Sequence, residues 1–150
     1  MILHLGVNDV PYSHSANTGK SKTGKQRVST TGEVAEILED KYSVMGTFWS
    51  LHQDEVVAEL EGAIGGALET LLTSESSSAR VSESITSDIE DMFQKFLSGR
   101  EMDGVVAGVP TAAAQAGVSH RFKHPYARRA PRPSFIDTGL YESSFKAWVD

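Results

Sequence analysis

The sequence predicts a helix-dominated α+β fold, in which a long N-terminal helical body packs with a second helix and a small sheet, and extended arms flank this body. Three observations support the prediction. Apolar residues recur at helical spacing over residues 34–71 and again over 81–97. The short apolar run MILHLGV at residues 1–7 is typical of a strand or of an anchoring strip. Polar and proline-rich segments beside the helical patterns contain too few apolar residues to pack on their own.

These patterns divide the 150 residues into three parts. Residues 1–29 are predicted to form a flexible N-terminal arm, and residues 30–116 a mainly helical body. Residues 117–150 combine a basic extended segment with an aromatic segment suited to assembly. Within the first part, residues 13–31 contain only two apolar side chains. Burial of so little apolar surface cannot offset the entropy lost on ordering, so we expect a loop or arm there.

The first helix is predicted to begin at Thr30. The stretch from Thr30 to Glu33 fits a capping box, in which each of these two side chains accepts a hydrogen bond from the backbone amide of the other. Apolar residues then follow, mostly at spacings of three or four: Val34, Leu38, Tyr42, Met45, Trp49, Val56, Leu60, Ala63, Ala67 and Leu71. A glycine inside a helix costs ~1 kcal/mol relative to alanine, so we expect a kink or break at Gly46, Gly62 or Gly65-Gly66. The last three glycines also leave room for another helix to approach.

The second helix is predicted over residues 82–98, where one apolar stripe separates from the acidic side chains. Gly99 follows at the position of a C′ glycine. Residues 110–116 suit a short helix with Pro110 in its first turn. Residues 119–134 contain three prolines and five basic side chains with few apolar ones, and we expect them to be extended.

Composition excludes several classes of protein. The chain has no cysteine, which excludes disulfides and thiolate sites and fits synthesis in the cytosol. No apolar run approaches the ~20 residues of a membrane span, and the start lacks the basic region of a signal peptide. We therefore expect a soluble protein that is not secreted.

The net charge of −6 is unevenly distributed. Residues 33–103 contain sixteen acidic and four basic side chains, whereas residues 104–136 contain five basic side chains and no acidic one. Residues 1–32 are also basic, with four basic side chains and one acidic. An acidic body flanked by basic segments can associate with copies of itself, because each basic segment can meet the acidic surface of a neighbour.

The sequence motifs that could indicate catalysis, nucleotide binding or metal binding are incomplete. Residues 19–25 have the G-x-x-x-x-G-K spacing of a phosphate-binding loop, but Gln26 stands where such a loop needs Ser or Thr for magnesium. His120 and His124 have the spacing of zinc ligands on a helix, but Pro125 and the flanking arginines disfavour both helix and cation. No G-x-S-x-G motif occurs, and no acidic pair stands out. We expect neither an enzyme nor a cofactor or metal site.

The basic segment 119–132 interleaves Phe122 and Tyr126 with arginine and lysine. It has three interpretations: a nucleic-acid contact made by phosphate binding and stacking, a solvated loop, or an arm that clasps a neighbouring subunit. We favour the third because the acidic body offers a complementary surface. The first would make the protein a small nucleic-acid-binding regulator, which is the alternative function. Candidate DNA-facing residues are Arg121, Lys123 and Arg128.

The last sixteen residues of the sequence include four large aromatic ones: Phe135, Tyr141, Phe145 and Trp148. They either close the core of the body, with Asp137 or Thr138 capping a short final helix, or anchor an inter-subunit contact. Aromatic and arginine side chains concentrate binding energy at interfaces. The second interpretation predicts these interface residues: Arg128, Arg129, Arg132, Phe135, Tyr141, Phe145 and Trp148.

The strings GVSHRFK (117–123), RPSFIDTGLY (132–141) and SFKAWV (144–149) resemble a family of tailed-bacteriophage virion proteins. These are small neck and tail-completion proteins, also called virion morphogenesis or head–tail joining proteins. Many have a D-T-G-x-L-x-x-S pattern late in the chain, to which D-T-G-L-Y-E-S-S at residues 137–144 is similar with an offset of one position. The string TTGEVAEILE (30–39) is similar to myophage members of the group.

The resemblance implies a structural role without catalysis. Such proteins form homo-oligomeric rings, for which hexamers and dodecamers are the natural candidates. The rings lie between the portal or head connector and the tail-tube or sheath proteins, with DNA threading the lumen. The resemblance therefore implies a protein of the virion neck or tail that assembles in the host cytoplasm.

Overall fold

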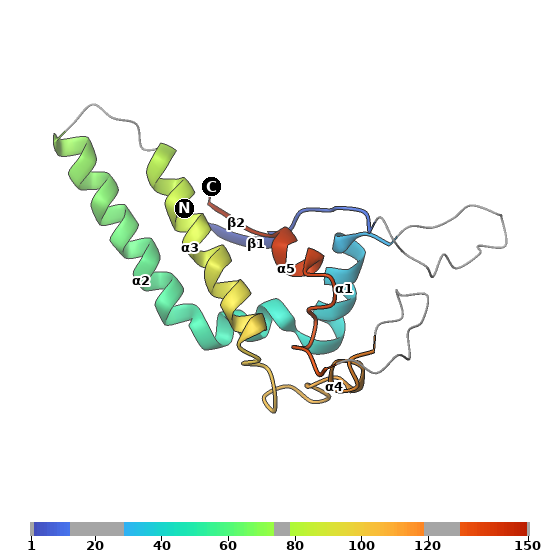
Figure 1. Ribbon diagram of the computed structural model, residues 1–150. Helices are drawn as coiled ribbons and strands as arrows, with labels where there is room; N and C mark the ends of the chain where they lie inside the picture. Colours follow the sequence, from blue (N-terminus) through green and yellow to red (C-terminus); the bar gives the residue numbers. More distant parts are fainter. Residues whose placement is uncertain (1, 13–28, 74–78, 119–129, 150) are drawn as a thin grey trace.

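Two long antiparallel helices and a two-stranded sheet form the centre of the molecule in a computed structural model, which describes residues 2–12, 29–73, 79–118 and 130–149 (Figure 1). The helix-dominated α+β class is confirmed. The elements in chain order are β1 (Leu3–Val7), α1 (Thr31–Tyr42), α2 (Val44–Thr73), α3 (Ala79–Ser98), α4 (Ala112–Gln115), α5 (Leu140–Ser144) and β2 (Phe145–Val149).

The core lies where the first half of α2, the second half of α3 and β2 meet. Phe48, Phe93 and Phe96 have no exposed surface, and Phe145 from β2 inserts between the two helices. The rings of Phe93 and Phe145 stack with centroids 3.8 Å apart. Phe48 meets Phe93 edge-on at 5.3 Å. These rings form one contiguous core. Phe93 and Phe96 lie on the predicted second stripe, but in the first stripe the predicted Trp49 is 40% exposed and its neighbour Phe48 is the buried aromatic residue.

The sheet joins the two ends of the chain. Strands β1 and β2 pair antiparallel, from Leu3 opposite Val149 to Val7 opposite Phe145. Side chains alternate along a strand, so Leu3, Leu5 and Val7 pack against the core. The opposite, outer surface carries Trp148, whose ring stacks on His4 with centroids 5.3 Å apart.

Residues 3–7 are therefore a strand, as one of the two interpretations predicted, and belong to the folded body. Of the predicted N-terminal arm, residues 1–29, the part from Leu3 to Val7 is thus paired in the sheet. Tyr12 is buried as well, and its backbone amide donates a hydrogen bond to the carbonyl of Ser29 over 3.0 Å. The polar stretch 13–28, predicted to be a loop or arm, lies outside the described residues.

The N-terminus of α1 is fixed by the chain that follows β1. Thr30 is the N-cap, and its hydroxyl accepts a hydrogen bond from the amide of Glu33 over 3.3 Å, as the capping box predicts. The Thr31 hydroxyl is buried, donates to the carbonyl of Asn8 over 2.5 Å and accepts from the amide of Val10 over 2.8 Å. This clamp ties the start of the helical body to the segment after β1.

The predicted break in the first helix falls at Ser43 and not at a glycine. Ser43 adopts a left-handed conformation with φ of 49°. The carboxylate of Glu39 then caps the start of α2, because it accepts hydrogen bonds from the amides of Met45 (2.7 Å) and Gly46 (3.0 Å). This capping, which glycine propensity ignores, decides the position of the break. Gly62, Gly65 and Gly66 lie inside an unbroken α2.

Replacement of Glu39 by alanine is expected to lower the free energy of unfolding by about 1–2 kcal/mol, because the first amides of α2 lose their acceptor. Glu36→Ala is the matched control, since Glu36 is an exposed carboxylate one turn earlier on the same helix. Its effect should stay within about 0.5 kcal/mol. Urea denaturation of both variants measures the difference, and equal effects would contradict the capping role of Glu39.

Helix α3 ends at Ser98, as predicted, but the left-handed residue that follows it lies one position later than expected. The left-handed residue is Arg100, with φ of 60°, and not Gly99. The amides of Arg100 and Glu101 donate to the carbonyls of Leu97 and Phe96, which is the Schellman pattern with Arg100 at C′. Gly99 is needed for space, because a Cβ there would lie 2.8 Å from the carbonyl oxygen of Lys95.

The two short helices also begin differently from the prediction. Thr111 caps α4 by accepting from the amide of Ala114 over 3.2 Å, so Pro110 precedes the cap and is outside the first turn. Gly139 is the N-cap of α5 and has no side chain to offer. Thr138, one residue earlier, accepts only a long hydrogen bond of 3.4 Å from the amide of Leu140.

Candidate functional site

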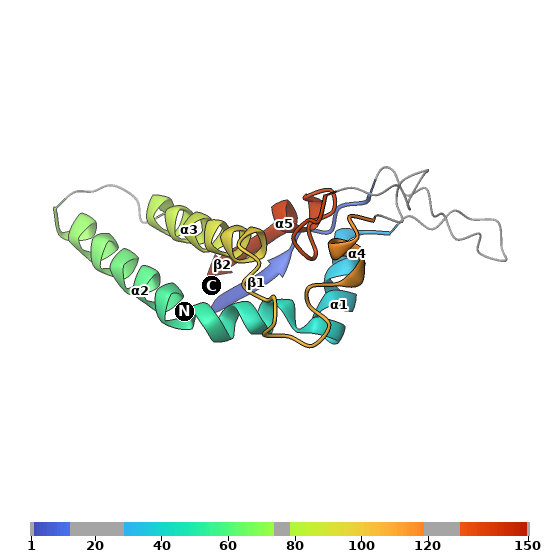
Figure 2. The same ribbon diagram turned by 60° about the horizontal axis from the view of Figure 1, so that its bottom comes forward.

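The distal half of α2 extends away from the sheet and the short helices (Figures 1 and 2). Four large apolar side chains along α2 are exposed to solvent. These four side chains are spaced by seven, four and four residues along the sequence. At 100° per residue this spacing places them within a sector of about 80° around the helix. Leu68 is 56% exposed and Leu72 is 86% exposed. We call this surface the outer face of α2, and it consists of Val57, Ile64, Leu68 and Leu72.

A second side of the same helix faces α3 and is distinct from the outer face. Val56 is fully buried there, and Leu60 and Ala63 are partly buried against the core. A row of large exposed apolar side chains is typical of an interaction surface, because each side chain costs solvation free energy until a partner covers it. The outer face is thus the strongest candidate for a functional site among the described residues.

Three glycines lie on the distal half of α2, where Gly65 borders the outer face and Gly62 and Gly66 lie farther round the helix. A Cβ added at Gly62, Gly65 or Gly66 would have no atom within 4 Å outside the helix itself. Packing among the described residues therefore gives no reason for glycine at Gly62 and Gly65, although each costs ~1 kcal/mol of helix propensity. Bare backbone allows a partner to approach the helix closely, as the sequence suggested.

The electrostatic environment of the outer face is acidic. Helix α2 contains five acidic residues and no lysine or arginine: Asp54, Glu55, Glu59, Glu61 and Glu69. An acidic helix repels anionic lipid headgroups and nucleic-acid phosphates, and it suits a partner that brings apolar and basic groups together. None of the helices in the described ranges combines the length and hydropathy needed to cross a membrane.

The structure separates the predicted interface residues into several groups. Tyr141 and Phe145 are core residues, and Phe145 is only 1% exposed, so neither presents its side chain on the surface of the folded chain. Burial also raises the pKa of Tyr141. Trp148 is 48% exposed and accessible on the outer surface of the sheet. Phe135 is half-buried against the ring of Tyr42, with centroids 5.1 Å apart.

The described contacts of Arg132 are with residues of its own chain. Its guanidinium donates to the carbonyls of Ile136 over 2.7 Å and Val118 over 3.3 Å, and it lies 3.6 Å from the carboxylate of Asp137. Its backbone amide donates to the carbonyl of Ala114 in α4 over 3.1 Å. These contacts fix the ends of the basic segment to α4. The other predicted interface or DNA-facing residues lie outside the described residues: Arg121, Lys123, Arg128 and Arg129.

A histidine links α2 to the turn after α3. The ring nitrogens of His52 lie 3.0 Å from the carboxylate of Glu55 and 2.8 Å from that of Glu101. The ring also packs against Phe48 and Phe96. Burial lowers the pKa of His52, but hydrogen bonds with the two carboxylates outweigh this effect and raise the pKa above 6.5.

The raised pKa of His52 predicts a pH dependence of stability. A raised folded-state pKa means that the contribution of protonated His52 is full below the unfolded value of about 6.5 and is lost as the pH rises through the folded value. The free energy of unfolding should therefore fall as the pH rises above about 6.5. In His52→Gln this fall should be smaller. Denaturation at several pH values measures both proteins, and superimposable pH profiles would contradict the prediction.

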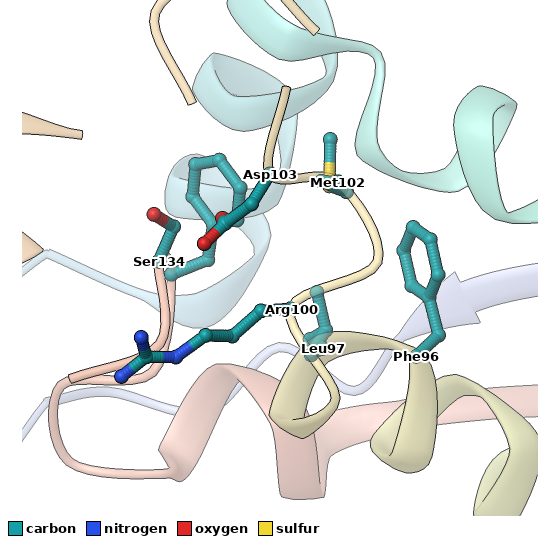
Figure 3. A pocket seen from close by; sticks show the side chains of 7 residues that line it. Phe96, Leu97, Arg100, Met102, Asp103 and Ser134 are labelled. Carbon is teal, nitrogen blue, oxygen red and sulfur yellow. The ribbon is translucent and has the colours of Figure 1, made fainter. Parts of the chain in front are cut away.

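A small pocket lies beneath the turn after α3, where Asp103 lies beside Ser134 (Figure 3). Its other lining side chains include Phe96, Leu97 and Met102 from the core. The space between them does not admit a water molecule. In the described part of the chain, no three His, Asp or Glu side chains are grouped as metal ligands would be.

The comparisons with known proteins add no relative: no protein-family model, curated protein or solved structure matches the chain. The candidate site therefore stands on its own geometry.

Sequence reasoning missed the outer face. The spacing pattern from Val34 to Leu71 was assigned to a single stripe, and the second set at 57, 64, 68 and 72 was not separated from it. A second helical periodicity, offset by one residue from Val56, was the available signal. Of the two stripes, one packs on the core and the other is exposed.

Proposed function

We propose that this protein is a structural virion protein of a tailed phage. It forms part of the head–tail neck, as a collar, tail-completion or tail-terminator-type ring, through homo-oligomerisation. The observation that carries the proposal is the outer face of α2, an exposed apolar surface on a helix that already packs on the core through an adjacent side. A ring subunit needs such a surface, because it buries part of itself against identical neighbours.

The resemblance to neck proteins supports the same role. The D-T-G-L string at 137–140 leads into α5, and the SFKAWV string forms the end of α5 and β2. These residues close the core and pair with the N-terminal strand. The segment that resembles the family therefore builds the scaffold from which α2 and α3 project.

The proposed partners follow from a position in the neck. They are the portal or head connector on one side and tail-tube or sheath proteins on the other, around non-specifically contacted DNA. The ring contains six or twelve copies, is assembled in the host cytoplasm and remains in the virion. A role in catalysis is not part of the proposal.

A phage that lacks this protein tests the proposal. Electron microscopy should show complete heads and complete tails that are not joined, and infectivity should be lost and then restored by the protein supplied in trans. Joined, infectious particles without the protein would contradict the proposal. Salt-sensitive DNA binding by the purified chain, together with normal particles, would instead favour the regulator that uses residues 119–132.

A further inference from the structure

We infer that the outer face of α2 binds the basic segment 119–129 of a second copy of the chain. This inference rests on the proposed homo-oligomer and names the surfaces that hold it together. The face offers four exposed apolar side chains on a helix with five acidic residues and no lysine or arginine. An occupant must therefore bring apolar groups and positive charge.

The chain contains one stretch with that chemistry. Residues 119–129, SHRFKHPYARR, have four basic side chains and no acidic one, and they include two large aromatic side chains, Phe122 and Tyr126. Aromatic side chains can cover the leucines of the outer face, while arginines meet carboxylates such as Glu61 and Glu69. The outer face of a second copy is a poorer occupant, because the two acidic helices would repel each other.

Both ends of this segment are fixed at α4. The amide of Val118 donates to the carbonyl of Ala113 over 2.9 Å. The guanidinium of Arg132 donates to the carbonyl of Val118 over 3.3 Å, which ties the two flanks of the segment together. The segment consequently leaves and re-enters the described structure at nearly the same place.

This anchoring excludes docking within one chain. Eleven residues that start and finish at one place reach outward by at most about 20 Å, at ~3.4 Å per residue out and back. Leu68 lies 24 residues beyond the start of α2, which is about 36 Å at 1.5 Å per residue. Helix α4 lies at the opposite end of the molecule from the tip of α2 (Figures 1 and 2). The segment reaches the outer face only on a neighbouring subunit.

Cross-linking tests the inference directly, because the natural chain has no cysteine. One full-length chain carries Leu68→Cys and another carries Tyr126→Cys, and a short bis-maleimide is added to each chain and to their mixture. We expect a dimeric product from the mixture that neither chain forms alone. Glu59→Cys, at an exposed position on another side of α2, replaces Leu68→Cys as the matched control and should give little product.

A charge exchange provides the second measurement. Glu61→Arg with Glu69→Arg, or Arg128→Glu with Arg129→Glu, should each raise the dissociation constant of self-association about tenfold or more. All four substitutions in one chain should restore most of the affinity. Circular dichroism confirms that each variant retains its helices.

The possible outcomes separate this inference from the proposed function. If the chain self-associates but Leu68→Cys links only to Leu68→Cys, or to no other chain, the docking inference is wrong and the homo-oligomer stands. If Arg128→Glu with Arg129→Glu abolishes DNA binding and leaves self-association unchanged, the segment binds nucleic acid and the inference is again wrong. If the chain does not self-associate at all, both proposals fail.

Discussion

Replacement of Phe145 by alanine is expected to lower the free energy of unfolding by about 3–5 kcal/mol. The ring is 1% exposed and stacks on Phe93 at 3.8 Å. Its removal leaves a cavity where both long helices meet β2, and the surrounding rings cannot collapse into it without leaving their own contacts. Because a domain of this size is stable by only about 5–15 kcal/mol, the variant should be partly unfolded at moderate temperature.

Trp148→Ala is the matched control for Phe145→Ala. It lies on the same strand but on the outer surface of the sheet, is 48% exposed and contacts mainly the ring of His4. The loss of that stacking should cost about 1 kcal/mol, although tryptophan is the larger side chain. Thermal denaturation of the two variants distinguishes them. A larger loss in Trp148→Ala than in Phe145→Ala would contradict the assignment of Phe145 to the core.

Replacement of Ile64 and Leu68 together by glutamine is expected to weaken self-association about 100-fold. Each side chain contributes roughly 1.5 kcal/mol or more when buried against a partner, and a factor of ten corresponds to ~1.4 kcal/mol. Glutamine is a good helix former, so α2 itself should persist. Both positions are exposed in the single chain, and the unfolding midpoint should change little.

Glu59→Gln serves as the control for this double variant, because Glu59 is exposed on another side of α2. It should leave both the fold and the dissociation constant nearly unchanged. Sedimentation velocity over a concentration series measures self-association, and circular dichroism measures the helix content. If the double variant assembles like the natural chain, the outer face is not a subunit contact. If it loses its helices, the outer face belongs to the fold of the single chain.

The helices could be predicted from the sequence because their apolar residues repeat with the helical period. The position of the break between α1 and α2 could not, since it depends on one carboxylate. Glycine propensity pointed to Gly46 or beyond, whereas the side chain of Glu39 satisfies the first amides of α2 and places the break at Ser43. A cap made by a residue seven positions upstream has no local sequence signature.

The aromatic C-terminal residues show a second limit of prediction from the sequence. The sequence left two interpretations of Tyr141, Phe145 and Trp148, closure of the core or a contact between subunits, and treated the three residues as one group. The alternation of a strand separates two of them, because in FKAWV the first and third residues face the core while Trp148 faces outward. That argument required knowing that β1 pairs with β2, and pairing between the two ends of a chain is a tertiary property.

The outer face of α2 could be listed from the sequence but not recognised. An apolar residue on a helix is either core or surface, and only the packed structure shows that Val56 is buried by the core while Leu68 is exposed. For the basic segment the sequence tells more than the structure. Its charge is evident from the sequence, whereas residues 119–129 lie outside the described residues.

The mass of the full-length chain in solution tests the central claim most directly. Native mass spectrometry and sedimentation equilibrium over a wide concentration range should show a closed oligomer of six or twelve copies of the 16.2 kDa chain. The Ile64→Gln/Leu68→Gln variant should shift this equilibrium toward the single chain at the same concentrations. A natural chain that remains a 16.2 kDa monomer at every concentration would contradict the claim that this protein is a self-assembling ring subunit.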